Sequence, residues 1–241
     1  MLGLALGALG GAAAASFAGY HSMAPTSQLW GRTVVRSSNP KHLALTYDDG
    51  PNDPHTLRLL DVLARHQVRA TFFLIGRYVR QRPDIARELL RSGHAIGNHT
   101  FTHPNLIWVS RADLRKQLEE CQTAIEDAVG QRPTLFRPPF GGRRPVTLRV
   151  ARAMGCHPVM WNVTGWDWNA KSAEYIENKV TRQMRGGDVV LLHDGGHLQF
   201  GADRGYTVTA TDRLIQRYKC EGREFVTIPE IVVSSQLSAV S

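Results

Sequence analysis

Two neighbouring carboxylates and two spaced histidines are the residues of this sequence with the clearest capacity for chemistry. Asp48 and Asp49 stand side by side in the stretch ALTYDDGPND, between an apolar run and a Gly-Pro turn. His99 and His103 are four positions apart, a spacing that puts two imidazoles on one side of a helical turn. Two histidines and one carboxylate form a three-ligand set for a catalytic metal, with positions left open for water and substrate.

Further polar residues follow other apolar runs of the chain. Arg137 follows TLF, Asp167 and Trp168 lie in NVTGWDW, and His193 ends the run DVVLLH. In parallel α/β folds the functional site lies at the carboxyl ends of the strands. We therefore expect these residues to gather on one rim with the two aspartates and the two histidines.

Each of these signals has a plain structural alternative when it is taken alone. An Asp-Asp pair can be a solvated turn or a helix N-cap, and two histidines can share this spacing by chance. Arg137 could form a structural ion pair, and His193 could be a hydrogen-bonded core histidine. The conjunction of all of them, in strand-end order, favours a catalytic site.

The elements that must position these residues alternate between strand-like and helix-like patterns. Asp53-Pro54 predicts the start of a helix, Pro83 opens another, and Ser110 with Asp113 forms a capping-box pattern ahead of a helix that ends at Gly130. Alternation of this kind predicts a parallel sheet in an α/β barrel, complete or incomplete, and an open doubly wound sheet is the alternative. The strand-like runs are 42–47, 70–75, 94–97, 134–137, 157–161, 188–192 and 223–228.

Five short motifs, in this order, resemble those of the polysaccharide deacetylases, the NodB-homology group of carbohydrate esterase family 4. They are TYDDG (46–50), HTFTH (99–103), RPPFG (137–141), GWDW (165–168) and LLHD (191–194). The resemblance covers roughly residues 40 to 230. It implies a distorted (β/α) barrel, usually of seven strands, and removal of N-acetyl or O-acetyl groups from polysaccharides with the help of a divalent metal.

The resemblance also implies the metal ligands. Carried over to this sequence, Asp49, His99 and His103 would bind the ion. Zinc is the expected metal, with cobalt as an alternative.

Acid and base roles follow from the same resemblance. Asp48 would be the general base, held by Arg137, and His193 would be the general acid, tuned by Asp167. The chemistry of amide hydrolysis agrees with these roles, because a water molecule must lose a proton and the leaving amine must gain one. An arginine keeps a neighbouring carboxylate ionised, and a carboxylate favours the imidazolium form of a histidine.

Substrate contacts are implied at three further positions. Trp168 and Leu191 would line a pocket for the acetyl methyl group, and the main-chain N–H of Phe140 would help to hold the oxyanion. Two positions depart from the common family pattern. Phe140 stands where many relatives have tyrosine, and Thr164 stands where the fourth motif often begins with aspartate, which puts substrate contacts near 164–166 in doubt.

Composition and charge narrow the function classes. The chain has 241 residues, an apolar content of 42% and a formal charge of +8, values that suit one globular domain attracted to anionic partners. No motif of a nucleic-acid-binding module accompanies the positive charge, so we expect no nucleic-acid partner. We expect a monomer that acts on a polysaccharide or oligosaccharide.

The N-terminal residues and the three cysteines give predictions about location, domain bounds and disulfide bonding. Residues 1–19 contain no charge, which is typical of a signal peptide or a membrane anchor and predicts an extracytoplasmic protein. Residues 20–39 read as a connector, and 40–235 as the catalytic domain. Cys121 falls on an apolar helical stripe and is expected to be buried, whereas Cys156 and Cys220 could pair if the protein is exported.

Taken together, the sequence predicts a metal-dependent polysaccharide deacetylase that acts on N-acetylglucosamine polymers such as peptidoglycan or chitin oligomers. The alternatives are a hydrolase of the same fold that acts on O-acetyl xylan or a small cyclic amide, and a non-catalytic polysaccharide-binding module. A basic nucleic-acid binder is the third.

Overall fold

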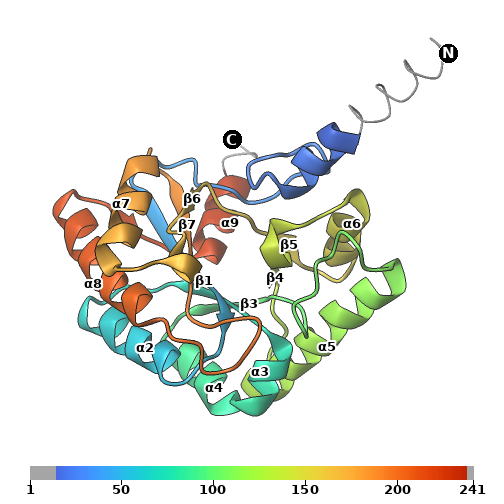
Figure 1. Cartoon of the computed structure of the whole chain (residues 1–241), viewed down its shortest axis with the longest axis horizontal. Coiled ribbons are helices and arrows are strands. Elements are labelled where there is room, and N and C mark those ends of the chain that lie inside the picture. The colour runs from blue at the N-terminus through green and yellow to red at the C-terminus, as the bar shows by residue number, and fades with distance from the viewer. Residues whose placement is uncertain (1–14, 238–241) are drawn as a thin grey trace, which may run out of the picture.

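A curled parallel sheet organises the computed structural model, which describes residues 15–237 of the chain (Figure 1). Within that range seven strands follow the order β5-β4-β3-β2-β1-β7-β6, and an eighth, β8, pairs with the start of β1. Every pairing between these strands is parallel. The strands are β1 His42–Gly50, β2 Thr71–Leu74, β3 Ala95–Asn98, β4 Leu135–Phe136, β5 His157–Pro158, β6 Val163–Thr164, β7 Asp188–His193 and β8 Glu224–Phe225.

Helices lie as an arc around the outside of the sheet (Figure 1). Most of them connect one strand to the next, as a parallel sheet requires. They are α2 His55–Arg65, α3 Gly76–Gln81, α4 Pro83–Arg91, α5 Arg111–Val129, α6 Pro145–Ala153, α7 Ala173–Gln183 and α8 Gly205–Cys220, while α9 Ile228–Leu237 lies inside the arc (Figure 1). The predicted barrel-type α/β fold is therefore confirmed, in a distorted form whose edge strands β5 and β6 are not paired with each other.

Strand β1 shows how the sheet separates two cores. Leu43, Leu45 and Tyr47 pack outward in the large cluster formed with the surrounding helices. Ala44 packs in the smaller inner cluster, and the Thr46 hydroxyl is bonded to a buried arginine of the interior. Successive strand residues face opposite sides of a sheet, so every second residue from Ala44 to the end of the strand faces the interior.

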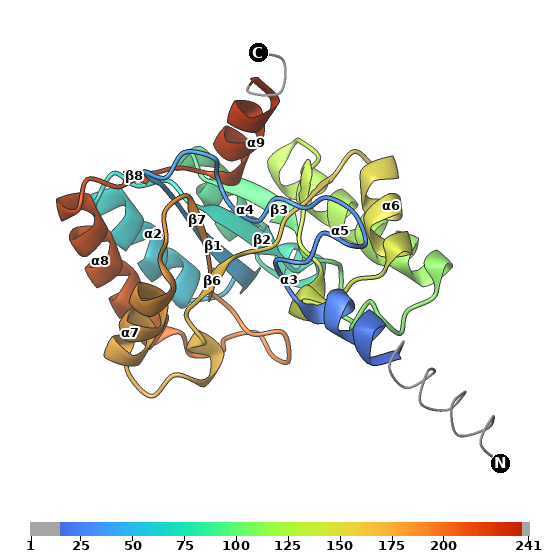
Figure 2. The same cartoon turned by 90° about the horizontal axis from the view of Figure 1, so that it is seen from above.

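Helix α9 fills the interior at the end of the sheet opposite to the loops that follow β6 and β7 (Figure 2). Ile228 and Ile231 are buried there beside Ala44 and Phe73. The sequence predicted a strand over 223–228, but only Glu224–Phe225 pair with β1, and the chain is helical from Ile228. This part of the prediction was wrong because an apolar run serves equally well as a strand or as a buried helical turn.

The predicted helix boundaries were confirmed at α4 and α5. Pro83 is the first residue of α4, the Ser110 side chain accepts a hydrogen bond from the Asp113 N–H, and Gly130 ends α5 in the left-handed conformation. The start predicted at Asp53-Pro54 was confirmed, because α2 begins at His55, but the expected cap was wrong: Asp53 does not cap the helix and forms an ion pair with Arg82 instead.

Two other predictions about secondary structure and cysteines need correction. Strand β6, Val163–Thr164, was not predicted, because two residues have no recognisable period and this strand exists only through its pairing with β7. Cys156 and Cys220 do not form a disulfide; the first is buried and the second is exposed at the end of α8. Cys121 is buried as expected.

Residues 20–39, expected as a connector, lie against the domain. Residues 15–23 are helical, and Val34 pairs with Val159 beyond the end of β5. The predicted signal peptide or anchor at 1–19 lies mostly outside the described residues. No helix within residues 15–237 combines the length and the apolar character needed to cross a bilayer.

The packing of α9 generates a stability prediction. Ile231 is 2% exposed whereas Val233 on the same helix is 55% exposed. Replacing Ile231 by alanine leaves a cavity in the inner core, so Ile231→Ala should lower the free energy of unfolding by about 2–5 kcal/mol in urea titrations. The matched control Val233→Ala should change it by less than about 0.5 kcal/mol. Equal effects of the two substitutions would contradict the placement of α9.

Candidate active site

The carboxyl ends of the strands surround a pocket of about 690 Å³. Strand register brings these ends together: Asp48 pairs with His193 across β1 and β7, and Asn98 pairs with Phe136 across β3 and β4. Eight of the ten residues predicted from the sequence line the pocket, and the other two, Arg137 and Asp167, are buried and bonded to pocket residues. The eight are Asp48, Asp49, His99, His103, Phe140, Trp168, Leu191 and His193.

The backbone at Asp49 explains how two adjacent acids reach one pocket. Neighbouring residues of a regular strand point to opposite faces, so one carboxylate of the pair would normally face the helices. Asp49 has a φ of 74°, and the register of β1 against β2 shifts between Asp48 and Gly50. This left-handed residue breaks the alternation, and both aspartates, each 3% exposed as a residue, line the pocket.

His99 and His103 are positioned by hydrogen bonds within their own loop. The Asn98 side chain donates to the Leu118 carbonyl and accepts from the Thr100 N–H, and the Thr100 hydroxyl accepts from the His103 N–H. Thr100 and His103 have φ values of 67° and 62°, so the turn between the two histidines is not a regular helix. The four-residue spacing therefore brings the imidazoles together through a fixed, strained loop.

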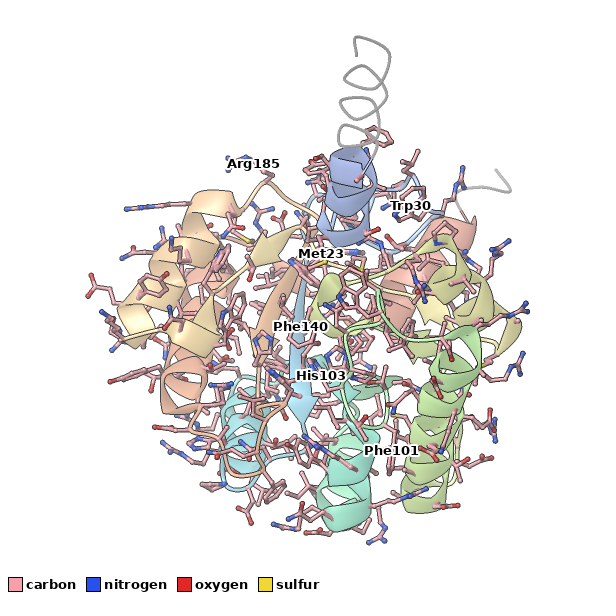
Figure 3. All side chains as sticks on the ribbon, turned by 45° about the vertical axis from the view of Figure 1, so that its right-hand side comes forward. Met23, Trp30, Phe101, His103, Phe140 and Arg185 are labelled. Carbon is pink, nitrogen blue, oxygen red and sulfur yellow. The ribbon has the colours of Figure 1, made fainter. Side chains whose placement is uncertain are left out.

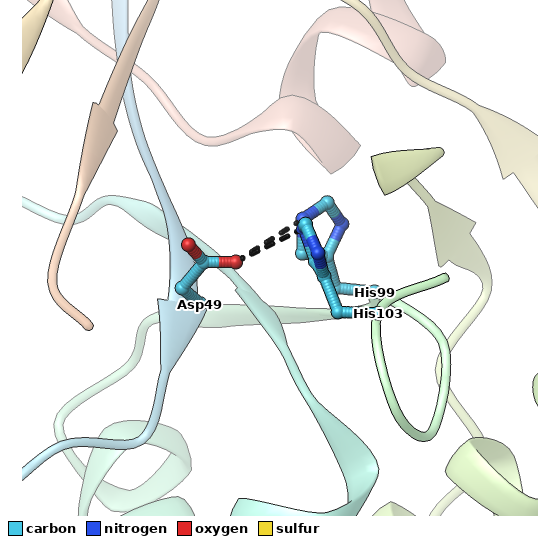
Figure 4. A group of neighbouring side chains, drawn as sticks. All are labelled: Asp49, His99 and His103. Atoms are coloured by element: carbon cyan, nitrogen blue, oxygen red, sulfur yellow. Dashed lines mark ion pairs between the residues drawn. The ribbon is translucent and has the colours of Figure 1, made fainter. Parts of the chain in front are cut away.

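The two imidazoles and the Asp49 carboxylate converge on one point (Figure 4). One potential ligand atom from each residue lies within 4.8 Å of the others. Asp49 Oδ1 is 3.6 Å from His99 Nε2 and 3.3 Å from His103 Nε2, and it has no hydrogen-bond partner although it is buried. An unpaired buried carboxylate oxygen facing two ring nitrogens fits a metal ion, because such an atom is costly to bury alone.

The protonation of these groups also suits a cation. His99 Nδ1 is 2.8 Å from the Arg137 carbonyl oxygen, which leaves Nε2 to face Asp49. Burial, reinforced by the neighbouring His99, lowers the pKa of His103 to about 3, so its imidazole is neutral. Burial raises the pKa of Asp49, but His197, His103 and other histidines outweigh it and hold that pKa well below its usual range. Neutral imidazoles and an ionised carboxylate are the forms that bind metals.

Arg137 lies directly behind Asp48 and is completely buried. Its Nη1 donates to Asp48 Oδ1 at 2.8 Å and to the Thr46 hydroxyl at 2.8 Å, while Nη2 donates to the Met160 carbonyl at 3.0 Å. The guanidinium also lies 4.1 Å from the centre of the Phe73 ring. These contacts fix one oxygen of Asp48 and leave Oδ2 toward the pocket, 3.6 Å from His99 Nε2.

His193 and Asp167 form a second ion pair, in which Asp167 is buried and His193 is partly buried. Asp167 Oδ1 is 2.9 Å from His193 Nδ1, while Oδ2 accepts from the His193 N–H at 2.7 Å and from the Thr207 hydroxyl at 2.9 Å. Burial would lower the pKa of His193, but the charge and hydrogen bond of Asp167, with Asp49 and Asp48 farther away, raise it to about 9. The ring is therefore protonated at neutral pH, with Nε2 left free of Asp167.

Apolar and aromatic side chains shape the rest of the pocket. Leu191 is buried on β7, and the Trp168 ring packs edge-on against His193 with centroids 5.2 Å apart. Phe140 has a φ of 57° and presents a half-exposed ring edge-on to His103, with centroids 4.6 Å apart. Figure 3 shows Phe140 close to His103 on this face.

One functional candidate was missed from the sequence. The His197 ring stacks on His103 with centroids 4.6 Å apart, and its Nδ1 is 3.8 Å from Asp49 Oδ2. His193 and His197 have the same four-residue spacing as His99 and His103, and that repeated spacing was the signal available in the sequence.

A model of the polysaccharide deacetylase family matches residues 36–159. The chain is 37% identical over 200 residues to a peptidoglycan-N-acetylglucosamine deacetylase of Bacillus cereus, which covers 82% of this chain and 70% of that protein. It is 36% identical over 206 residues to a chitooligosaccharide deacetylase of Sinorhizobium fredii, covering 83% and 96% of the two chains.

Among solved structures, the fold is similar to that of the Bc1960 peptidoglycan N-acetylglucosamine deacetylase. The TM-score is 0.76 and the identity 36%, over 83% of this chain and 91% of that one.

The His193–Asp167 pair generates a prediction about protonation. Asp167→Asn removes the nearby negative charge but keeps the shape of the side chain, so the pKa of His193 should fall from about 9 by roughly 1–3 units. An NMR titration of the histidine ring resonances of the metal-free protein measures this change. His66, which pairs with Asp212 away from the pocket, is the internal control. An unchanged His193 titration in the variant would contradict the assignment of Asp167 as the group that holds its proton.

Proposed function

Because the chain belongs to the polysaccharide deacetylase family, we propose that it hydrolyses N-acetyl groups on N-acetylglucosamine polymers such as peptidoglycan or chitin oligomers. Relatives with both kinds of substrate in their names support this proposal. The observation that carries it is that three groups of side chains meet at one pocket. They are the Asp49–His99–His103 group, the Asp48–Arg137 pair and the His193–Asp167 pair.

In this proposal Asp49, His99 and His103 hold a divalent metal ion. Two imidazole nitrogens and one carboxylate suit zinc, and cobalt accepts the same ligands. When bound there, the ion would lower the pKa of a water molecule and polarise the acetyl carbonyl. The His99 Nδ1 contact to the Arg137 carbonyl orients the ring for this role, so the loop after β3 and the loop after β4 act together.

Asp48 is the proposed general base. Its Oδ1 is held by the Arg137 guanidinium, which stops the carboxylate from rotating, while Oδ2 faces the pocket. A fixed, ionised carboxylate can remove the proton of an attacking water molecule, a contribution of about a hundredfold to ten-thousandfold in rate.

His193 is the proposed general acid. Asp167 occupies Nδ1, so the proton on Nε2 is the one available to the sugar amine as it leaves. The raised pKa ensures that this proton is present at neutral pH. The sugar amine needs this proton in order to leave, because a deprotonated amine is a very poor leaving group.

The remaining predicted residues receive roles in binding the acetyl group. Trp168 and Leu191 provide an apolar wall for its methyl group. Contact with this wall removes the methyl group from water, which favours binding. The main-chain N–H of Phe140 is the proposed donor to the carbonyl oxygen as negative charge develops on it. Because a backbone group would serve, phenylalanine at this position is compatible with the role.

We further propose that 40–235 is the catalytic domain and that residues 20–39 are a connector packed against it. Action on cell-wall polysaccharide places the enzyme outside the cytoplasm, secreted or anchored through residues 1–19. A net charge of +8 favours approach to an acidic polymer. We expect a monomer.

The separate roles of neighbouring acids give a first test. Asp48→Asn should keep a bound metal ion, because Asp48 is the base and not a ligand, yet lose at least about a hundredfold in kcat/KM. His103→Ala should lose both the ion and the activity. Metal content by elemental analysis and acetate release by a coupled assay measure the two properties separately.

Two exposed residues provide matched controls for these substitutions. Asp61→Asn and His157→Ala change the same residue types on the surface and should leave metal content and turnover unchanged. Full activity of Asp48→Asn, or full metal occupancy of His103→Ala, would contradict the roles assigned here.

The function itself is tested by acetate release from a substrate panel. Chitooligosaccharides, peptidoglycan and acetylxylan are each supplied with zinc, with cobalt and with a chelator. We expect release from the N-acetylglucosamine substrates with metal and none with chelator. Release from acetylxylan alone would assign an O-acetyl esterase, and no release from any substrate would favour a non-catalytic binding module.

A further inference from the structure

His197 lines the active-site pocket, but the proposed reaction gives it no role. It lies in the loop between β7 and α8. Its side chain is 35% exposed, whereas the side chains of Asp49 and His103, which it contacts, are each 4% exposed. His197 is therefore placed at the mouth of the pocket, on the solvent side of two proposed metal ligands.

One face of the His197 ring packs on a proposed metal ligand. It stacks on the His103 ring with centroids 4.6 Å apart and planes inclined by 24°. The Phe140 ring packs edge-on against both imidazoles, with centroids 5.1 Å from His197 and 4.6 Å from His103. Stacked and edge-to-face contacts are the favoured arrangements of such rings. His103 is thus held by two neighbours, and its ring cannot turn without moving them.

A nitrogen of the same ring faces the proposed carboxylate ligand. His99 and His103 both face Asp49 Oδ1, at 3.6 and 3.3 Å, whereas His197 Nδ1 lies 3.8 Å from Asp49 Oδ2. A separation of 3.8 Å is that of an electrostatic contact and not of a hydrogen bond. This contact favours the orientation in which Oδ2 faces away from the other two imidazoles and Oδ1 faces them. Outer contacts of this kind orient ligating carboxylates.

The ring geometry separates His197 from the ligands themselves. The lone pair of an imidazole nitrogen lies in the ring plane, so a ligand ring must point its edge at the ion. The planes of His197 and His103 are close to parallel, and they do not intersect near the ring nitrogens. Among residues 15–237, the group whose ligand atoms lie within 4.8 Å of one another consists of Asp49, His99 and His103. His197 is therefore suited to hold the ligands and not to join them.

The loop that carries His197 is bonded to helix α3. The Tyr78 hydroxyl donates to the Gly196 carbonyl at 3.0 Å, and the Arg77 guanidinium donates to the carbonyl of His197 itself. The half-exposed ring is thus held in place through its own backbone. A residue supported in this way can fix its neighbours, because it does not move freely with solvent.

We propose that His197 is a positioning residue of the metal site, which fixes His103 by stacking and Asp49 by an electrostatic contact. The inference rests on the proposed function, because the ion is part of that function. Two of the three proposed ligands then reach their binding orientation before the ion arrives. Partners of metal ligands typically change metal affinity by about 10–100-fold, and His197 should do the same.

The test measures the dissociation constant for zinc by competition with a chromophoric chelator. Circular dichroism checks that each metal-free variant is folded. His197→Ala should weaken zinc binding by about 10–100-fold. His197→Phe should recover part of this loss, because it keeps the stack on His103 but has no nitrogen toward Asp49. His157→Ala, which removes an exposed histidine outside the pocket, should bind zinc as tightly as the wild type.

Cobalt distinguishes a positioning residue from a ligand. The visible absorption of bound Co²⁺ reports the number and type of its ligand atoms, so His197→Ala saturated with Co²⁺ should keep the wild-type bands. A changed spectrum would make His197 a ligand and overturn the proposal. Wild-type zinc affinity in His197→Ala would overturn it as well. Loss of acetate release with unchanged zinc affinity would assign the ring to the substrate, which is a third contradicting outcome.

Failure of the proposed function would give a different pattern, because zinc affinity and acetate release are measured separately. If the wild-type protein binds zinc but releases acetate from no substrate, the proposed reaction fails. Weaker zinc binding by His197→Ala would still support the positioning role in that case. If the wild type releases acetate and both proteins bind zinc equally, the reaction stands and the role of His197 fails.

Discussion

The buried guanidinium of Arg137 is the interaction on which the site depends. It joins Asp48 and Thr46 of β1 to the Met160 carbonyl beyond β5, and it lies against the Phe73 ring of β2. The carbonyl of the same residue faces His99 Nδ1. One side chain and its own peptide group therefore set the orientation of both the proposed base and one proposed metal ligand.

The buried Arg137–Asp48 ion pair contributes little to the stability of the fold. Moving an arginine and an aspartate out of water costs several kcal/mol, and their attraction offsets this only when the geometry and the other hydrogen bonds are good. Arg137 retains an Nε that has no hydrogen-bond partner among the described residues. The arrangement is better understood as a way to hold a charged carboxylate still in a dry pocket, where electrostatic effects are strong.

Charge balance explains how so many ionisable groups share one cavity. Asp48 is compensated by Arg137, Asp167 by protonated His193, and the orphan oxygen of Asp49 faces two imidazoles where a cation would fit. Backbone strain accompanies this arrangement. Of the six non-glycine residues with positive φ in the described range, all but Gln67 are site residues or directly adjoin one in the sequence. Strain concentrated in this way is a feature of functional regions, where the surrounding fold enforces the geometry.

Residue types, their order and the resemblance of five motifs to a known family were sufficient to predict which residues meet at the pocket. The apolar runs placed Asp48, His99, Arg137, Asp167 and His193 at or after the ends of five of the seven predicted strands, and parallel strands bring such ends to one edge. The capping pattern at Ser110 was also readable, because it involves only neighbouring residues.

Tertiary structure decided the features that depend on partners distant in the sequence. The left-handed turn at Asp49, the two-residue strand β6 and the ion pair that removes Asp53 from its helix all arise from such contacts. The N-terminal segment lies against the domain through distant partners, among them Arg143, which is more than a hundred residues away and is bonded to its carbonyls. Local sequence determines the chemical groups that a residue offers. Long-range packing determines which other residues those groups contact, because only the folded chain brings distant partners within bonding distance.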